Sequence, residues 1–151
     1  MKKFAPPDFR AQRLFELRGE VILLPSQVGW GQMHHSDALG TDILCDTSGE
    51  KPFGLGWIKF PPNGEVKLHT HEGSHVLICF AGRGQVKVEI NIPAERQSFQ
   101  GHELSPGDCY SIGSLVAHSV HAGPDGLTLL VVGNDYRNAT STDRLQMVKT
   151  E

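Results

Sequence analysis

The chain has 151 residues, 38% of them hydrophobic, and a formal charge of −3 at pH 7. This length suits one domain with its own core, and the hydrophobic content excludes a disordered chain. The absence of a basic patch argues against a nucleic-acid partner. No apolar run approaches the roughly 20 residues that cross a bilayer. The first residues lack the apolar segment of a secretory signal, so we expect a cytoplasmic protein without membrane association.

The three cysteines, Cys45, Cys79 and Cys109, are widely spaced and form no C-x-x-C pair. An odd number in this arrangement argues against a disulfide framework and against a cysteine zinc site. Because free cysteine is usually buried, we expect buried thiols that act as small hydrophobic residues.

The expected elements are short β-strands separated by turns rich in glycine and proline. Residues 1–24 should form an N-terminal arm that ends in a first strand over 20–24, residues 25–135 a barrel, and residues 136–151 a polar tail that packs loosely or contacts a partner subunit. Further strands are predicted over 28–33, 54–60, 66–71, 75–80, 85–92, 98–104, 109–112, 117–122 and 127–132, with a short apolar piece at 43–45.

The segment 85–92 has the clearest strand pattern, because valine and isoleucine alternate strictly with polar residues along it. That period of two predicts a half-buried antiparallel strand. The glycine-rich stretch 81–84 suits a hairpin turn before it, and 123–126 should link the last two strands. Many short strands with closely spaced turn signals predict a single-domain all-β sandwich or barrel.

The candidate functional residues are mainly histidines. His69, His71 and His75 lie within one short stretch, and His118 follows in a similarly patterned one. Imidazole is the commonest side-chain ligand for divalent transition metals. Residues two apart on a strand point to the same face, so His69 and His71 can face inward together. We expect the four imidazoles to meet at one ion inside the barrel.

Other interpretations of these residues remain open. Glu72 is an alternative ligand, but it directly follows His71 and faces away on a continuing strand. The opposing interpretation of the four histidines is a barrel that no longer binds metal, in which hydrogen bonds hold the rings. The remaining histidines have no partner spacing: His34, His35 and His102 are expected at the surface, and His121 on the face opposite His118.

Two histidine motifs, in register, resemble those of the cupin superfamily over residues 54–133. In the first, Gly64 precedes His69-Thr-His71, His75 follows after three residues, and Gly82 after six more. In the second, Gly107 is followed after five residues by Gly113-Ser-Leu115 and then by His118. The departures are four residues in place of five after Gly64, His75 in place of the usual Glu, Gly113 and Leu115 in place of Pro and Gly, and Ala122 in place of Asn.

The resemblance implies an all-β cupin jelly-roll barrel that holds a divalent transition metal (Fe, Mn, Ni or Zn) and pairs as a homodimer. It is similar to three-histidine cupins, which include dioxygenases, so a dioxygenase acting on a small oxygen-bearing substrate is the expected function. A metal-assisted isomerase, lyase or decarboxylase, and a non-catalytic ligand-binding or sensory cupin, are the alternatives. Strand parity and proximity to the motifs predict the residues that line the pocket: Trp57, Lys67 (as a carboxylate anchor or as a solvated rim residue), Leu77, Cys79, Tyr110, Val116 and Val120.

Overall fold

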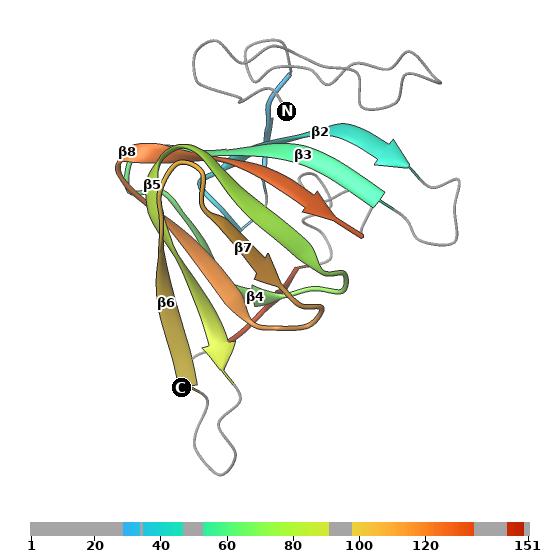
Figure 1. Ribbon diagram of the computed structural model, residues 1–151. Helices are drawn as coiled ribbons and strands as arrows, with labels where there is room; N and C mark the ends of the chain where they lie inside the picture. Colours follow the sequence, from blue (N-terminus) through green and yellow to red (C-terminus); the bar gives the residue numbers. More distant parts are fainter. Residues whose placement is uncertain (1–28, 34, 47–52, 91–97, 135–144, 150–151) are drawn as a thin grey trace.

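The computed structural model describes residues 29–33, 35–46, 53–90, 98–134 and 145–149 (Figure 1). Its strands are β1 (Gly31–Gln32), β2 (Leu39–Asp46), β3 (Phe53–Phe60), β4 (Glu65–Thr70), β5 (His75–Ile90), β6 (Ser98–Leu104), β7 (Cys109–Ile112), β8 (His118–Gly133) and β9 (Gln146–Met147). The described part of the chain contains no helix that could span a membrane.

The strands form two antiparallel layers that share β5 and β8. In the first layer, residues 127–133 of β8 lie between β3 and residues 75–82 of β5, with β1 and β2 beyond β3 and with β7 beyond β5. In the second layer, residues 118–122 of β8 lie between β4 and residues 84–88 of β5, with β9 and β6 outside them. Figure 1 shows both long strands bending as they pass from one layer into the other. This curled arrangement confirms the expected all-β jelly roll.

The bends in the long strands correct two sequence-based expectations. The stretch 81–84 was expected to form a hairpin turn and 123–126 a link between strands, but each lies inside one continuous strand. Gly82 and Gly126 both adopt a φ of +78°, a conformation that glycine takes without steric cost. A Cβ on Gly82 would collide with the carbonyl oxygen of Gly126. Together with two register shifts in β5, these glycines bend strands β5 and β8, and both strands continue past the bend.

Alternation along the strands gives the barrel an apolar interior. Val86, Leu129, Val131 and Ile112 are almost completely buried on the inner faces of the two layers. The outer faces differ sharply from each other. Buried and half-buried apolar residues, among them Trp57 and Leu130, cover the outer face of the first layer. The second layer exposes polar and charged side chains, among them Lys67, Gln85, Lys87 and Glu103.

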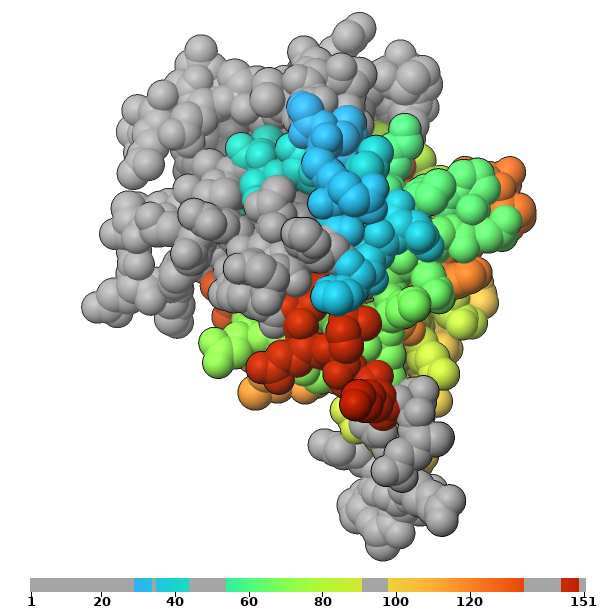
Figure 2. Space-filling model, turned by 180° about the vertical axis from the view of Figure 1, so that it is seen from behind, coloured from blue at the N-terminus to red at the C-terminus, as the bar shows by residue number. Residues whose placement is uncertain are grey.

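Several expectations concern residues outside the described part of the chain: the arm and strand over 1–24, His34, and the end of the segment 85–92. Within the segment expected over 28–33, the described residues 29–33 contain only the short β1. The apolar piece 43–45 belongs to the longer β2. In the C-terminal segment, residues 146–147 form β9, which pairs with β4 beside His69. Figure 2 shows these residues, in dark red, on the surface of the molecule.

Candidate metal centre

The histidines of the two motifs face the interior because of the strand register. His69 on β4 is the direct partner of His118 on β8, and His118 is in turn paired with the buried Val88 on β5. Directly paired residues in an antiparallel sheet point to the same side. His69 and His118 are therefore both buried, although they lie far apart in the sequence.

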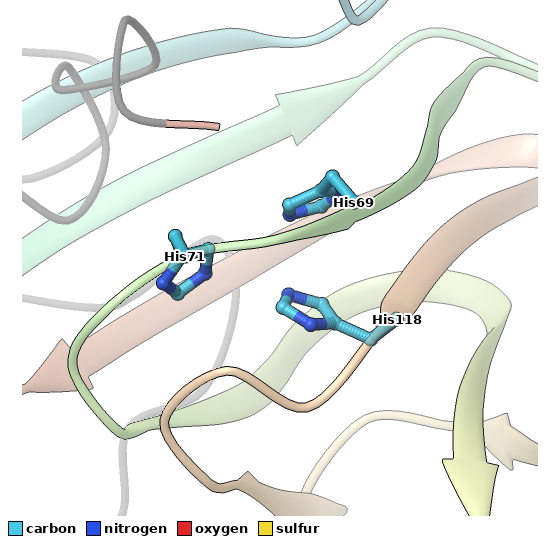
Figure 3. Close-up of side chains that lie close together, drawn as sticks. All are labelled: His69, His71 and His118. Carbon is cyan, nitrogen blue, oxygen red and sulfur yellow. The ribbon is translucent and has the colours of Figure 1, made fainter. Parts of the chain in front are cut away.

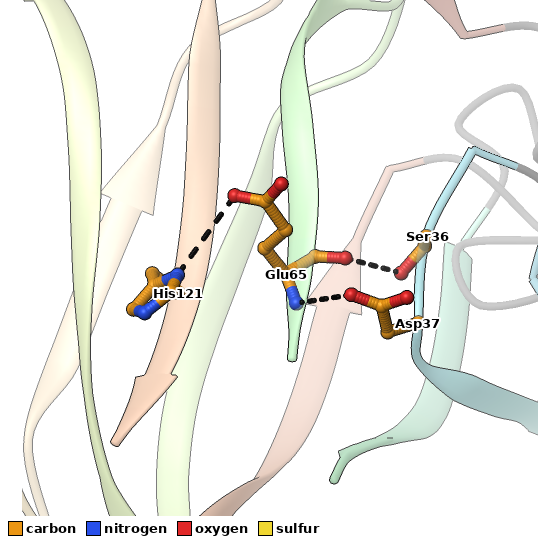
Figure 4. A network of polar contacts seen from close by, with 4 residues as sticks. All are labelled: Ser36, Asp37, Glu65 and His121. Carbon is orange, nitrogen blue, oxygen red and sulfur yellow. Dashed lines mark hydrogen bonds and ion pairs between the residues drawn. The ribbon is translucent and has the colours of Figure 1, made fainter. Parts of the chain in front are cut away.

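Contacts at both of its ends hold the short strand β4 in place. At the start, the backbone N–H of Glu65 donates to Asp37 Oδ2 at 3.0 Å, and Ser36 Oγ donates to the Glu65 carbonyl at 3.2 Å (Figure 4). At the other end, Val148 donates from its backbone N–H to the carbonyl of Leu68 at 3.1 Å. The strand that carries His69 is thus fixed along its length by segments distant in sequence.

Three imidazoles converge in this interior. His69, His71 and His118 each offer a ring nitrogen, and these three atoms lie within 4.8 Å of one another. Figure 3 shows the three rings, two from the β4 side and one from the start of β8, turned toward a common space. The ring centroids are 4.3 Å apart for His69 and His118 and 5.1 Å apart for His71 and His118.

The backbone selects which nitrogen each ring presents. Nδ1 of His69 lies 2.7 Å from the carbonyl oxygen of Lys67, and Nδ1 of His118 lies 2.8 Å from that of Val116. Nδ1 of His71 lies 2.9 Å from the carbonyl of Glu72. Because a carbonyl only accepts, each Nδ1 carries the proton in these bonds, and the Nε2 lone pair is left for a ligand. Metal-binding histidines are oriented in the same way.

His75 lies against the three-histidine group but is not part of it. Its ring centroid is 4.8 Å from that of His71 and 5.1 Å from that of His118. The side chain is buried, and its Nδ1 has no hydrogen-bond partner. A buried polar atom without a partner is costly, and a ligand or ion bound at this nitrogen would remove that cost.

Burial keeps these imidazoles neutral. Desolvation lowers the pKa of His69 to about 4, although the bond to the Lys67 carbonyl works in the opposite direction. Desolvation, with a further contribution from His71 and His69, lowers the pKa of His75 to about 3. Desolvation also lowers the pKa of His118 to about 2, assisted by the neighbouring histidines and opposed by the bond to Val116. Neutral rings at neutral pH have the lone pairs that metal binding requires.

These observations fit a divalent transition metal. Two nitrogens bound to one ion at about 2.1 Å lie at most about 4.2 Å apart. The observed limit of 4.8 Å is close to this value, so small ring rotations bring the group to bonding distance. Glu72, the alternative ligand, is exposed and contributes its backbone carbonyl to His71 in place of its carboxylate.

Most of the residues predicted to line the pocket lie on the inner face. Leu77, Cys79 and Val120 are buried there, and Tyr110, the partner of Leu77, is half-buried against the same core. Val116 is half-buried and lies two residues before His118. Its backbone carbonyl accepts the hydrogen bond from Nδ1 of His118.

Trp57 and Lys67 do not lie on the inner face, and the exposure of Lys67 agrees with a solvated residue and not with a carboxylate anchor at the metal. Trp57 is paired with Leu130, and both therefore point to the outer face, where Trp57 is fully buried and packs edge-on against Phe80. Lys67 is exposed because β4 contains a bulge: two residues separate Val66 from His69, whereas only one separates their partners on β8. Simple parity counted back from His69 therefore assigns Lys67 to the wrong face.

The remaining sequence-based expectations concern residues outside the metal group. His102, expected at the surface, is half-buried on β6 opposite the buried Val86, and its ring lies 4.7 Å from that of Tyr110. The alternation of 98–104 was too weak to reveal this inner position. His35 is exposed, and His121 is exposed on the outer face, 3.8 Å from Glu65. Of the described thiols, Cys79 is buried as expected.

Cys109 is exposed, which corrects the expectation that the cysteines are buried. It is paired with Ile78 on β5, next to the inward-facing Cys79, and so belongs to the outer face of the first layer. The two described thiols therefore lie on opposite sides of the same sheet.

No family model and no curated protein matches the sequence. Among solved structures, a cupin-2 domain protein of Rhodospirillum rubrum has a TM-score of 0.57 at 18% identity, over 75% of this chain and 66% of that one. An oxalate decarboxylase of Bacillus subtilis has a TM-score of 0.61 at 15% identity, over 82% of this chain and 31% of that one. The chain has the cupin fold. The chain is similar to a third structure as well, the formate complex of a Lactobacillus farciminis oxalate decarboxylase, with a TM-score of 0.59 at 14% identity, over 82% of this chain and 34% of that one.

The comparisons confirm the fold that the two histidine motifs indicated. The chain spans less than a third of the length of the Bacillus decarboxylase, with 31% of that chain covered. Because these identities are low, the likeness concerns the fold.

Proposed function

We propose that this cupin is a metal-dependent enzyme that acts on a small oxygen-bearing organic substrate, and that its reaction is a dioxygenation. The observation that carries the proposal is the convergence of His69, His71 and His118 within 4.8 Å inside the barrel. We include His75 as the fourth ligand, because its buried Nδ1 lacks a partner and its ring adjoins two members of the group.

The donor set favours a particular class of substrate. All four side chains are imidazoles, so no carboxylate among them offsets the charge of a divalent ion. An uncompensated positive site in a buried environment attracts an anionic or chelating oxygen substrate. Fe, Mn, Ni or Zn bound by these residues supplies Lewis acidity, and Fe or Mn also supplies redox chemistry with O2.

Apolar side chains on the inner faces adjoin the strands that carry the histidines. Val88 and Val120 lie on the inner face of the second layer, and Leu77 lies on that of the first layer. These short apolar side chains suit a small substrate. The half-buried Tyr110 next to Leu77 adds a phenolic hydroxyl to the same inner face, where it can orient a polar group.

A decarboxylase is the second candidate. The solved structures that resemble this cupin include oxalate decarboxylases, one of them in complex with formate. A carboxylate substrate also meets the charge preference of an all-imidazole site.

The test begins with anaerobic purification and metal analysis. Oxygen consumption and CO2 release are then measured with a panel of small acids, diketones and thiols. Oxygen uptake with product formation supports the dioxygenase, and CO2 release without oxygen uptake supports the decarboxylase. Ligand binding without turnover refutes both and leaves a ligand-binding or sensory cupin.

Histidine variants connect the activity to the metal site. His71→Ala and His118→Ala should lose most of the bound metal while the barrel stays folded by circular dichroism. His75→Ala should lose less, because the other three nitrogens remain. Normal metal content in His75→Ala would show that His75 is not a ligand.

We also propose that the protein is a homodimer, in which the outer face of the first layer contacts a second copy. Val76, Ile78, Leu130 and Val132 form paired, outward-facing positions there, and all are only half-buried. An apolar outer face of this kind is typical of association surfaces. Light scattering should give a dimer for the wild type and a monomer for Leu130→Glu. A monomeric wild type would refute this assembly.

A further inference from the structure

The turns next to His71 and His118 are bonded directly to each other. His71 lies one residue beyond the end of β4, at the start of the turn 71–74, and the turn 113–117 leads straight into His118 at the start of β8. The two turns are some 40 residues apart in the chain, as the sequence separation of 40 between Ser74 and Ser114 shows.

Three hydrogen bonds join these turns. The backbone N–H of Leu115 donates to the carbonyl of His71 at 2.9 Å. The N–H of Gly73 donates to Ser114 Oγ at 3.1 Å, and the N–H of Ser114 donates to Ser74 Oγ at 3.1 Å. Each serine hydroxyl thus accepts a bond from the opposite turn. We call this arrangement the serine clamp.

The clamp is anchored to the barrel on one side. The N–H of Ser74 donates to Asn134 Oδ1 at 2.7 Å, and the N–H of Asn134 donates to the carbonyl of Ser74 at 3.1 Å. Asn134 directly follows the end of β8. The turn that carries His71 is therefore held against both ends of the strand that carries His118.

The clamp also holds a strained residue. Leu115 has a φ of +62° and an exposed side chain, with 58% of its surface accessible. A left-handed backbone is unfavourable for a residue with a Cβ, and leucine, unlike asparagine, offers no local hydrogen bond in return. Such strain persists where the surrounding structure fixes the backbone, and it is concentrated at functional sites.

The position of His71 explains what the clamp does. His69 and His118 are direct partners within the sheet, so the ladder between β4 and β8 sets their separation. His71 lies outside that ladder and is only half-buried. Its backbone carbonyl is instead bonded to the turn that leads into His118, as the bond from Leu115 shows.

We propose that Ser74 and Ser114 are positioning residues that fix His71 relative to His118 and thereby set the metal affinity of the site. This inference rests on the proposed metal site. It adds that two serines outside the ligand set determine where the imidazole of His71 lies. Partners that orient metal ligands contribute about 10–100-fold to affinity in other proteins.

The experiment measures Co2+ binding by competition with a chelating dye, together with the visible absorption of the Co2+ form. Ser74→Ala and Ser114→Ala should each weaken Co2+ binding by about tenfold or more and change the absorption spectrum. Ser114→Thr keeps a hydroxyl at this exposed position and should restore both. Ser111→Ala is the matched control: Ser111 is an exposed serine on the adjacent strand β7 with no part in the clamp, and its loss should leave binding unchanged.

All measurements are made at a temperature where circular dichroism shows the metal-free variants to be folded, so that weaker binding does not reflect unfolding. Wild-type affinity and spectrum in both alanine variants would overturn the clamp while leaving the metal site intact. A wild type that binds no Co2+ would overturn the metal site and the clamp together.

Discussion

The metal-free protein should lose stability steeply as the pH falls below 6.5. Burial lowers the pKa of His69, His75 and His118 from 6.5 to about 4, 3 and 2. In the unfolded chain these imidazoles are hydrated and bind protons below pH 6.5, whereas in the folded protein they stay neutral down to about pH 4. The unfolded state therefore binds more protons in this window, and the free energy of unfolding decreases as the pH decreases.

The magnitude follows from the proton count. One pH unit below 6.5, each histidine lowers the free energy of unfolding by about 1.4 kcal/mol. Three histidines together remove about 4 kcal/mol, a large part of the roughly 5–15 kcal/mol that stabilises a typical domain. The contribution is almost fully retained at pH 7.5, one unit above the pKa of the unfolded histidines.

Urea-induced unfolding at pH 7.5, 6.5 and 5.5 in the presence of EDTA measures this dependence. His118→Asn should lose about a third of the pH slope, and the double variant His69→Asn/His118→Asn about two thirds. If the free energy of unfolding of the wild type is the same at pH 7.5 and 5.5, or if the variants keep the full slope, the buried neutral histidines are not as described.

Three further predictions concern the fold, its thiols and the metal site. Gly107→Ala, at a φ of +97° in open space, should lower the free energy of unfolding by about 1–2 kcal/mol. Gly82→Ala also forces a Cβ onto the Gly126 carbonyl and should lower the free energy of unfolding by more than about 3 kcal/mol. Equal losses in the two variants would show that the close approach of β5 and β8 is unimportant. Peptide mapping after brief iodoacetamide treatment at pH 8 should find Cys109 alkylated and Cys79 protected, because burial raises the pKa of Cys79 to about 11, with Asp108 adding to the effect. Lys67→Ala should leave Co2+ affinity unchanged, since the side chain is exposed, and a large loss would place Lys67 at the site after all.

The sequence was informative where histidines follow the period of two that is typical of a β-strand. His69 and His71 are two apart, and period two put both on one face without knowledge of the partner strand. The spacing around His118 placed it on the same barrel, and the structure brings these three rings together. The alternation in 85–92 likewise identified the inner residues Val86 and Val88.

The errors arose where local backbone geometry interrupts that period. The bulge in β4 turns Lys67 outward, and no residue type around it signals the extra position. Glycines at 81–84 are compatible with a hairpin turn and with a bent strand, and only the partner strand decides between them. The inner position of His102 follows from its pairing with Val86 across the β5–β6 ladder. The residues next to His102 in the sequence do not reveal that pairing.

The pairing of His69 with His118 has a consequence for biogenesis. These residues are 49 positions apart, and the ladder between them also needs β5, which is synthesised in between. During translation the ribosome must therefore release most of the barrel before the two rings can meet, and closing such distant contacts is slow. An ion bound by all the imidazoles would accordingly be acquired only after β8 has joined β4 and β5.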